Sequence, residues 1–413
     1  MQVPTARVTR VPDVLRRPRK PPKPPIDPEA RQRRLTVVRR AAVATWATVL
    51  VYRTLTAGVA FNRELVLVYV ATGLLAASIG RRKMLMVVRD WLPFAVVLLV
   101  YDISRGAAKL VGTPTLWQWQ VDADQWLFFG KVPTVWLQEH LKLAVPPWWE
   151  VVISTVYMSF FVLPYVVAGV LWLRDREDWK AFVRRFVALS FTALAIYIVL
   201  PAAPPWAAAR CTPADVVGGP SYPTCMFGTS QGVPDGGLLG SMQTSQPGAS
   251  DFVERISTRG WETLHLHVAR DLVNSGQVSV NMVAAIPSLH AALAAMVAAF
   301  LWRRVRRKWR PVLAGYVLMM AFTLVYSAEH YVIDILLGWG LAALVLAAVS
   351  RWESRRPKYD LPHDAAADCR TIPRDPDRCA AGVQRHAAAA PPDVVPALVR
   401  ANSADQQGGQ PDG

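Results

Sequence analysis

The sequence predicts an all-α, polytopic membrane protein, a bundle of about eight transmembrane helices. Of its 413 residues, 53% are hydrophobic and only 18% are charged, a balance that soluble domains of this size seldom reach. The apolar residues are concentrated in runs of nearly membrane-spanning length. Lys and Arg gather between these runs, whereas a nucleic-acid-binding protein would spread its net charge of +16 over a polar domain. The composition therefore predicts a membrane protein and no nucleic-acid partner.

A helix that crosses the hydrocarbon core needs about 20 mostly apolar residues, and eight stretches approach that length. The first two are the weakest, because they are separated by only a short connection and the first contains Arg53. These two could instead form one tight hairpin that partly re-enters the membrane. The expected spans are 41–61, 64–80, 87–105, 150–173, 186–201, 287–302, 312–329 and 331–350.

The distribution of Lys and Arg predicts the orientation, because basic residues near span ends are retained in the cytoplasm. Alternate connections hold 31 Lys and Arg residues on one side and 9 on the other. Both termini are therefore expected in the cytoplasm. Two large loops, 106–148 and 202–286, are expected outside. The basic side comprises 1–40, 81–89, 174–185, 303–310 and 351–358.

The first polar segment that can carry chemistry opens the sixth span and reads Pro287-Ser288-Leu289-His290. Pro287 is expected in the first helical turn, which would place Ser288, His290 and free backbone N–H groups at a helix N-terminus. Such an end is a ready anion-binding site. The alternative is a capping Ser beside an interfacial His.

The second polar segment lies at the junction before the eighth span. His330 and Asp334 are four residues apart, so they share one face if the helix begins at or before His330. A carboxylate there can hold the imidazole in one tautomer. Alone, this pair could be a local polar contact. Because both polar segments fall at the same membrane face, together they favour a site for covalent phosphoryl transfer.

Four cysteines in so long a chain exclude a disulfide-scaffold protein. Cys211 and Cys225 lie in the second outer loop and could close a short disulfide loop. Cys369 and Cys379 lie in the expected cytoplasmic tail, where thiols stay reduced.

The two polar segments resemble motifs of the phosphatidic acid phosphatase type 2 superfamily. Pro287-Ser288-Leu289-His290 is similar to its second motif, and His330-x-x-x-Asp334 to the end of its third. With Ala203-Pro204-Pro205-Trp206, they resemble more narrowly the inositol phosphotransferase branch, which includes inositol phosphorylceramide synthases. The resemblance covers roughly residues 95–350.

The resemblance implies a six-helix phosphatase-type core and a phosphohistidine mechanism. His330 would be the nucleophile, Asp334 would orient it, and His290 would protonate the leaving oxygen. Ser288 and neighbouring backbone N–H groups would hold the phosphoryl oxygens. Neither a metal nor another cofactor would be required.

The chain departs from the broad superfamily where that family has its cationic phosphate clamp. The third motif lacks its opening Ser-Arg, since Thr323 and Leu324 stand there, and the first motif is not recognisable. Arg105 and Arg210 are the preferred substitutes, because guanidinium geometry suits phosphate. For each, a rim salt bridge or a contact with a lipid headgroup is the alternative. The remaining outer cations considered are Lys109, Lys131 and Lys142.

The outer loops contain three further features of interest. Asp122 and Asp124 could bind a polyol headgroup or a metal. Apolar positions in 251–274 predict an interfacial helix that could cover the site. His265 and His267 point apart on such a helix, so we expect surface residues rather than metal ligands.

The resulting domain organisation has four parts. Residues 1–40 form a basic, Pro-rich cytoplasmic arm, and 41–86 contain two accessory spans. Residues 87–350 form the catalytic membrane domain, and 351–413 a disordered cytoplasmic tail.

The expected function is a lipid phosphotransferase of the cell membrane. It would move a phosphoryl or phosphoinositol-type group from a lipid donor to an alcohol at the extracytoplasmic face. Two alternatives stay open: a lipid phosphate or polyprenyl phosphate phosphatase with water as acceptor, and a proton-coupled transporter or flippase. The oligomeric state is not predicted.

Overall fold

A computed structural model describes most of the chain. The described residues are 28–57, 63–81, 84–104, 111–227, 235–244, 246–264 and 282–355. The chain divides into two compact units, Met1–Val349 and Ser350–Gly413. Every residue of the site discussed below belongs to the first unit.

Each of the eight expected spans corresponds to an α-helix, and the described residues contain no strand. Six of these helices are long and apolar enough to cross a membrane, so the chain is a multi-pass membrane protein. The other two, α2 and α12, have 16 and 14 residues. The helices are α1 (Pro28–Ala57), α2 (Arg63–Ser78), α3 (Met84–Ser104), α7 (Trp148–Arg174), α8 (Arg176–Val199), α12 (Leu289–Trp302), α13 (Arg310–Tyr326) and α14 (Val332–Arg355).

The first helix is longer than the sequence predicted. α1 begins at Pro28, inside the expected N-terminal arm, because proline is well suited to a first helical position. It packs against α2, where the Trp46 indole N–H donates to the carbonyl oxygen of Tyr69 at 3.1 Å. A Cβ on Gly73 would lie 2.8 Å from the Trp46 ring, so this glycine permits the close contact. The first two expected spans are therefore two packed helices.

The largest apolar core joins α2, α3, α7, α8, α12 and α14. Phe94 and Met296 are among its buried side chains. One carboxylate is buried beside it: Asp90 of α3 accepts a hydrogen bond from the Trp172 indole at 2.9 Å and pairs with Arg176. This pair ties α3 to the junction of α7 and α8.

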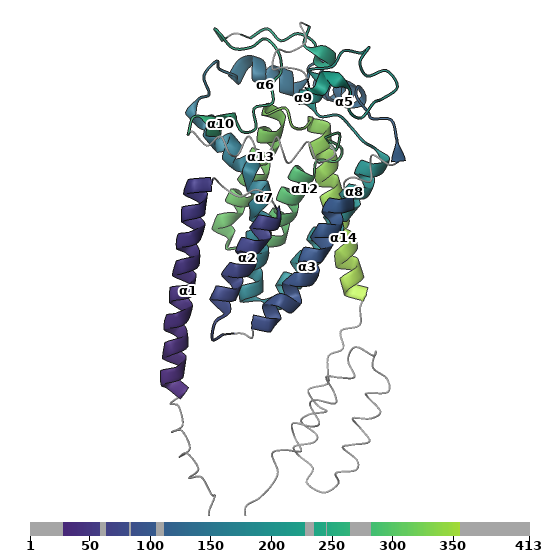
Figure 1. The fold of residues 1–413 in the computed structure, drawn as a ribbon. Helices are drawn as coiled ribbons and strands as arrows, with labels where there is room; N and C mark the ends of the chain where they lie inside the picture. Colours follow the sequence, from purple (N-terminus) through teal and green to yellow (C-terminus); the bar gives the residue numbers. More distant parts are fainter. Residues whose placement is uncertain are drawn as a thin grey trace, which may run out of the picture. The chain divides into compact units, whose positions relative to one another are not determined.

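The described parts of the two expected outer loops gather at one end of the spanning helices (Figure 1). We call these segments, 111–147, 200–227, 235–244 and 246–264, the cap. They contain only short helical elements. These are α5 (Trp119–Leu127), α6 (Pro133–Leu141), α9 (Pro205–Ala208), α10 (Arg259–Glu262) and the 3-10 turns Thr224–Phe227 and Gly237–Leu239.

A buried ion pair fastens the cap to α7. The Arg259 guanidinium donates to both carboxylate oxygens of Glu150, at 2.8 and 2.5 Å, and the Tyr326 hydroxyl donates to the same carboxylate at 2.7 Å. A Cβ on Gly260 would lie 2.1 Å from the Glu150 backbone. This contact explains why the interfacial helix predicted over 251–274 is wrong within 251–264: only four residues are helical there, and they are pressed against α7.

The cap also contains the disulfide that the sequence suggested. Cys211 and Cys225 are bonded, with their Cα atoms 5.2 Å apart. The Cys211 carbonyl accepts a hydrogen bond from the Leu238 N–H at 3.0 Å, so the bridge also holds the following loop.

Two isolated parallel bridges join two segments of the cap to each other and to the segment that precedes α12. Leu116 pairs with Ala202, and Ala202 pairs with Ala284. The four backbone hydrogen bonds are 2.7 to 3.1 Å long. Because the three segments lead into α5, α9 and α12, these bridges bring the starts of three elements to one place.

Candidate active site

The two histidines singled out in the sequence meet at the start of α12 and α14. His330 Nε2 lies 3.3 Å from His290 Nδ1. The His330 side chain is only 6% exposed. The structure thus brings together two residues that are 40 positions apart.

Asp334 lies on the other side of the His330 ring. Its Oδ2 is 3.5 Å from His330 Nδ1, and the carboxylate is fully buried. The same oxygen accepts a hydrogen bond from the Tyr331 N–H at 3.0 Å. A proton on Nδ1, facing Asp334, leaves the lone pair of Nε2 directed toward His290.

The pair does not depend on both residues being helical. α14 begins at Val332, so the condition for a shared helix face, a helix that begins at or before His330, is not met. His330 follows Ala328, whose φ of +59° is unusual for a residue with a side chain. The turn reverses the chain after α13, and His330 then reaches Asp334 from outside the helix.

Backbone contacts fix the register of α12 against α14. The Ser288 N–H donates to the Asp334 carbonyl oxygen at 3.0 Å. One turn further along α14, a Cβ on Gly338 would lie 2.4 Å from the Ser288 carbonyl oxygen. Glycine is therefore required at this close approach.

Ser288 is the N-cap of α12 and is fully buried. Its hydroxyl accepts a hydrogen bond from the Ala291 N–H at 3.3 Å. Pro287 precedes this cap, so the expectation that it lies in the first helical turn is wrong: α12 begins at Leu289, two positions later than predicted. The Ser288 side chain and N–H are thus engaged within the protein, and His290 lies in the first turn of α12.

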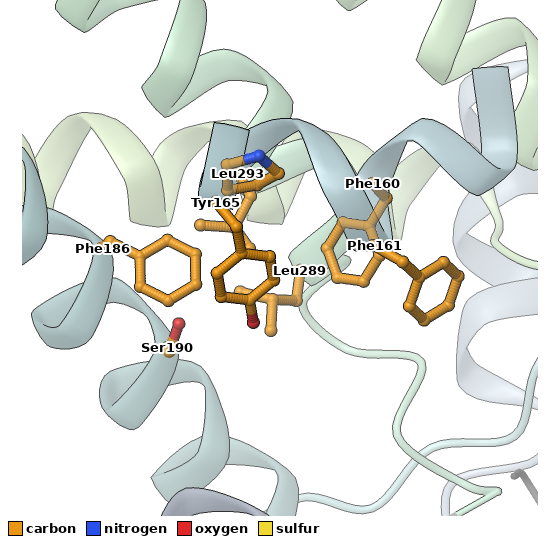
Figure 2. Close-up of a pocket in the computed structure, with 8 residues that line it drawn as sticks. Phe160, Phe161, Tyr165, Phe186, Ser190, Leu289 and Leu293 are labelled. Carbon is orange, nitrogen blue, oxygen red and sulfur yellow. The ribbon is translucent and has the colours of Figure 1, made fainter. Parts of the chain in front are cut away.

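Aromatic side chains of α7 surround His290. The Tyr157 ring stacks on the imidazole with centroids 5.3 Å apart, and the Phe160 centroid lies 4.0 Å away. A small, mainly apolar pocket continues from this wall between α7, α8 and α12. Figure 2 shows the rings of Phe186 and Tyr165 on one side of Leu289 and those of Phe160 and Phe161 on the other. The lining residues are Phe160, Phe161, Pro164, Tyr165, Phe186, Ser190, Leu289 and Leu293.

A buried ion pair that the sequence reasoning missed lies beside His330. Arg255 donates to both carboxylate oxygens of Glu329, at 2.8 and 3.0 Å. Arg255 is also hydrogen bonded to Tyr157, the residue that stacks on His290. A signal was present: Arg255 is one of few cations in the second outer loop, and Glu329 directly precedes His330.

The Ala-Pro-Pro-Trp segment supplies an aromatic surface for two guanidinium groups. Arg255 lies 5.1 Å from the Trp206 ring centroid and Arg210 lies 5.9 Å from it. Arg210 also donates to the Met226 carbonyl at 3.2 Å. Burial, and then the nearby charge of Arg255, lower the pKa of Arg210. The Trp206 N–H donates to the Ala328 carbonyl at 3.0 Å, so the surface is joined to the turn before His330.

The remaining cations and histidines singled out in the sequence differ in whether the structure describes them and in how far they are buried. Arg105 and Lys109 lie outside the described residues, as do His265 and His267. Lys131 is exposed. Lys142 is fully buried and donates to the Ser250 hydroxyl at 2.8 Å, and burial lowers its pKa. Of the preferred pair, the structure describes only Arg210, which lies over the Trp206 ring that Arg255 also contacts.

Asp124 is not available to a polyol or a metal. Its two carboxylate oxygens accept hydrogen bonds from the N–H groups of Ile333 and Val332, at 2.9 and 3.0 Å. Burial raises its pKa to about 6. Asp122 is exposed and accepts from the Gln118 amide. Within the described residues, no group of three or more His, Cys, Asp or Glu side chains is arranged to hold a metal ion.

Comparison with known sequences now decides the family. The sequence profile of the PAP2 superfamily matches residues 118–348, more than half of the chain. The chain belongs to the PAP2 superfamily. The match runs from the start of α5 almost to the end of α14 and includes every site residue named above except Arg105. This PAP2 protein is therefore an enzyme of the phosphatase or phosphotransferase kind, as the motifs indicated.

A curated relative of this PAP2 enzyme supports the narrower resemblance. The phosphoinositol dihydroceramide synthase of Bacteroides thetaiotaomicron is 24% identical over 262 residues, which cover 61% of this chain and 73% of the relative. No solved structure is significantly similar to the chain.

Proposed function

We propose that the protein transfers a phosphoryl or phosphoinositol-type group from a lipid donor to an alcohol acceptor, through a phosphohistidine at His330. The observation that carries this proposal is the placement of the His330 ring between Asp334, at 3.5 Å, and His290, at 3.3 Å. One neighbour orients the nucleophile and the other can exchange a proton.

The reaction has two balanced halves. Nε2 of His330 attacks phosphorus, the P–O bond to the donor's lipid alcohol breaks, and His290 gives its proton to the departing oxygen. His290 then takes a proton from the acceptor hydroxyl, whose oxygen attacks phosphorus. The P–N bond breaks, and its electron pair returns to Nε2.

We assign the phosphate-facing cations to Arg210 and Arg255 in place of the superfamily's missing clamp. Both guanidinium groups contact Trp206, and Arg255 joins the residues that flank the two histidines. The N-terminal dipole of α12 favours the same anion. Arg105 stays a sequence-based expectation.

We infer that the site is extracytoplasmic and that both termini are cytoplasmic. Lys and Arg are rare in the cap segments and frequent at the opposite span ends. The Cys211–Cys225 disulfide in the cap also favours an oxidising compartment.

Transfer to an alcohol is favoured over hydrolysis by the burial of the nucleophile. His330 is 6% exposed, and the rings of Tyr157 and Phe160 cover His290, so water has little access. The curated relative is named as a synthase, which agrees with this choice.

The test compares the wild type with His330→Ala in lipid nanodiscs, with phosphatidylinositol labelled at phosphorus and with ceramide, diacylglycerol or no added acceptor. We expect label in a new lipid and, in quenched wild-type reactions, acid-labile label on the protein. Label released in water-soluble inositol phosphate at the same rate without acceptor would show that water is the acceptor and that the enzyme is a hydrolase. Equal transfer by His330→Ala would overturn the nucleophile assignment.

Asp334→Asn provides a second variant in the same assay. The amide keeps the size of the side chain but does not hold the imidazole in the required tautomer, so turnover is expected to fall by roughly 10³- to 10⁴-fold. Unchanged turnover would remove Asp334 from the mechanism.

A further inference from the structure

The N-terminus of α14 is capped by a side chain from a distant part of the sequence. The first N–H groups of an α-helix have no partner within the helix. In α14, two of them donate to Asp124, which is 208 and 209 residues away on α5. Asp124 is fully buried, so water does not compete for these bonds.

The capped turn is the one that orients the nucleophile. The N–H of Tyr331 donates to Asp334, and those of Val332 and Ile333 donate to Asp124. Two buried carboxylates therefore hold three consecutive N–H groups directly after His330. The helix dipole favours negative charge at this end.

α5 is itself fixed in place, so it can hold this turn rigidly. It follows the Leu116–Ala202 bridge, and the Gln120 amide donates to the Ala203 carbonyl at 3.2 Å. A displacement of the first turn of α14 therefore requires Asp124 to lose its bonds or α5 to move with it.

We propose that Asp124 is a positioning residue for the phosphotransfer reaction: by capping α14 it holds His330 Nε2 in line with His290. This inference rests on the proposed function, but it assigns Asp124 no contact with the substrate. It also gives the first outer loop a specific task, since that loop carries Asp124 into the site.

The test uses Asp124→Asn, with Asp175→Asn as the matched control, because Asp175 caps α8 by accepting hydrogen bonds from the N–H groups of Glu177 and Asp178. An amide places an NH₂ group against a backbone N–H, so one of the two bonds is lost. A misplacement of about 1 Å at a reacting group can cost roughly 100-fold in rate. We expect kcat to fall 10- to 100-fold and KM to change less than about twofold, whereas Asp175→Asn leaves both unchanged.

A second measurement does not depend on turnover. ¹⁵N-histidine NMR of the folded protein reports which ring nitrogen of His330 carries the proton. We expect the Nδ1–H form in the wild type and in Asp175→Asn, and a mixture in Asp124→Asn. Asp124→Glu retains the carboxylate and should recover part of both readouts, and it replaces Asp124→Asn if that variant does not fold.

The outcomes separate the two proposals. Wild-type kcat and an unchanged tautomer in a folded Asp124 variant would overturn the positioning role while leaving the phosphohistidine mechanism intact. Full activity of His330→Ala would overturn the mechanism, and the NMR comparison would still decide whether Asp124 controls the His330 ring. A rise in KM with an unchanged kcat in the Asp124 variant would also contradict the positioning role.

Discussion

The apolar bundle and the cap are held together by different forces. In the bundle, side chains such as Phe94 and Met296 are buried among other apolar groups, and this attraction is not directional. The cap has a smaller apolar core of its own, but buried polar contacts join it to the bundle, including Arg259 with Glu150, Arg255 with Glu329 and Asp124 with the backbone of α14. Hydrogen bonds and ion pairs fix angles as well as distances. The bundle therefore brings the site helices together, and the cap sets the orientation of the reacting groups.

The largest expected effect comes from breaking the ion pair between the cap and the bundle. Arg259→Met leaves the Glu150 carboxylate buried without its cation, which costs about 3–5 kcal/mol. The matched control is Arg304→Met, whose pair with Asp178 is 36% and 35% exposed, and there we expect less than about 1 kcal/mol. Both free energies of unfolding can be measured by denaturant titration in mixed micelles. Equal losses would contradict the distinction between the two pairs.

The next effect is a pH dependence in which stability and activity change in opposite directions. Burial, together with the charge of nearby Asp334, raises the pKa of Asp124 from 3.8 to about 6. The folded state therefore binds the proton more tightly than the unfolded state. The free energy of unfolding should fall as pH rises from about 4 to 6, by on the order of 3 kcal/mol.

Activity should rise over the same pH interval, because only the ionised carboxylate accepts both N–H groups of α14. Other ionisable side chains lie in the same site, so the contribution of Asp124 is the difference between the wild type and Asp124→Asn at each pH. Identical pH profiles for the two proteins would show that Asp124 does not titrate in this range.

The smallest of these effects concerns the contact between α12 and α14. Gly338→Ala adds a methyl group 2.4 Å from the Ser288 carbonyl, and the strain should cost about 2 kcal/mol and reduce turnover by separating the histidines. Gly340→Ala is the control, because no atom lies within 4 Å of its added methyl group. Thermal unfolding and turnover of both variants test the contact. A Gly338→Ala enzyme with normal turnover would show that the register tolerates this shift.

The bundle and the central residues of the site could be predicted from the sequence. Hydropathy is a local property, so all eight helices were found from apolar length alone. His290, His330 and Asp334 could be identified because they lie in two short polar motifs, each at the end of a predicted span on the same side of the membrane. Their roles in catalysis remain predictions.

The cap could not be predicted in the same way, because its decisive contacts join residues far apart in the chain. Arg255 pairs with Glu329 across 74 positions, and Asp124 reaches α14 across more than 200. No periodicity marks such pairs. The apolar spacing over 251–274 indicated a helix, but the pair between Arg259 and Glu150 holds that chain in another conformation where the structure describes it.

The two backbone bridges through Leu116, Ala202 and Ala284 allow the site to tolerate sequence change. Their hydrogen bonds join main-chain atoms, so replacing these side chains leaves every bond in place unless a proline removes a donor. Surrounding residues can thus diverge while α5, α9 and α12 still start from the same point. An arrangement of this kind can be inherited by proteins that share only a quarter of their residues.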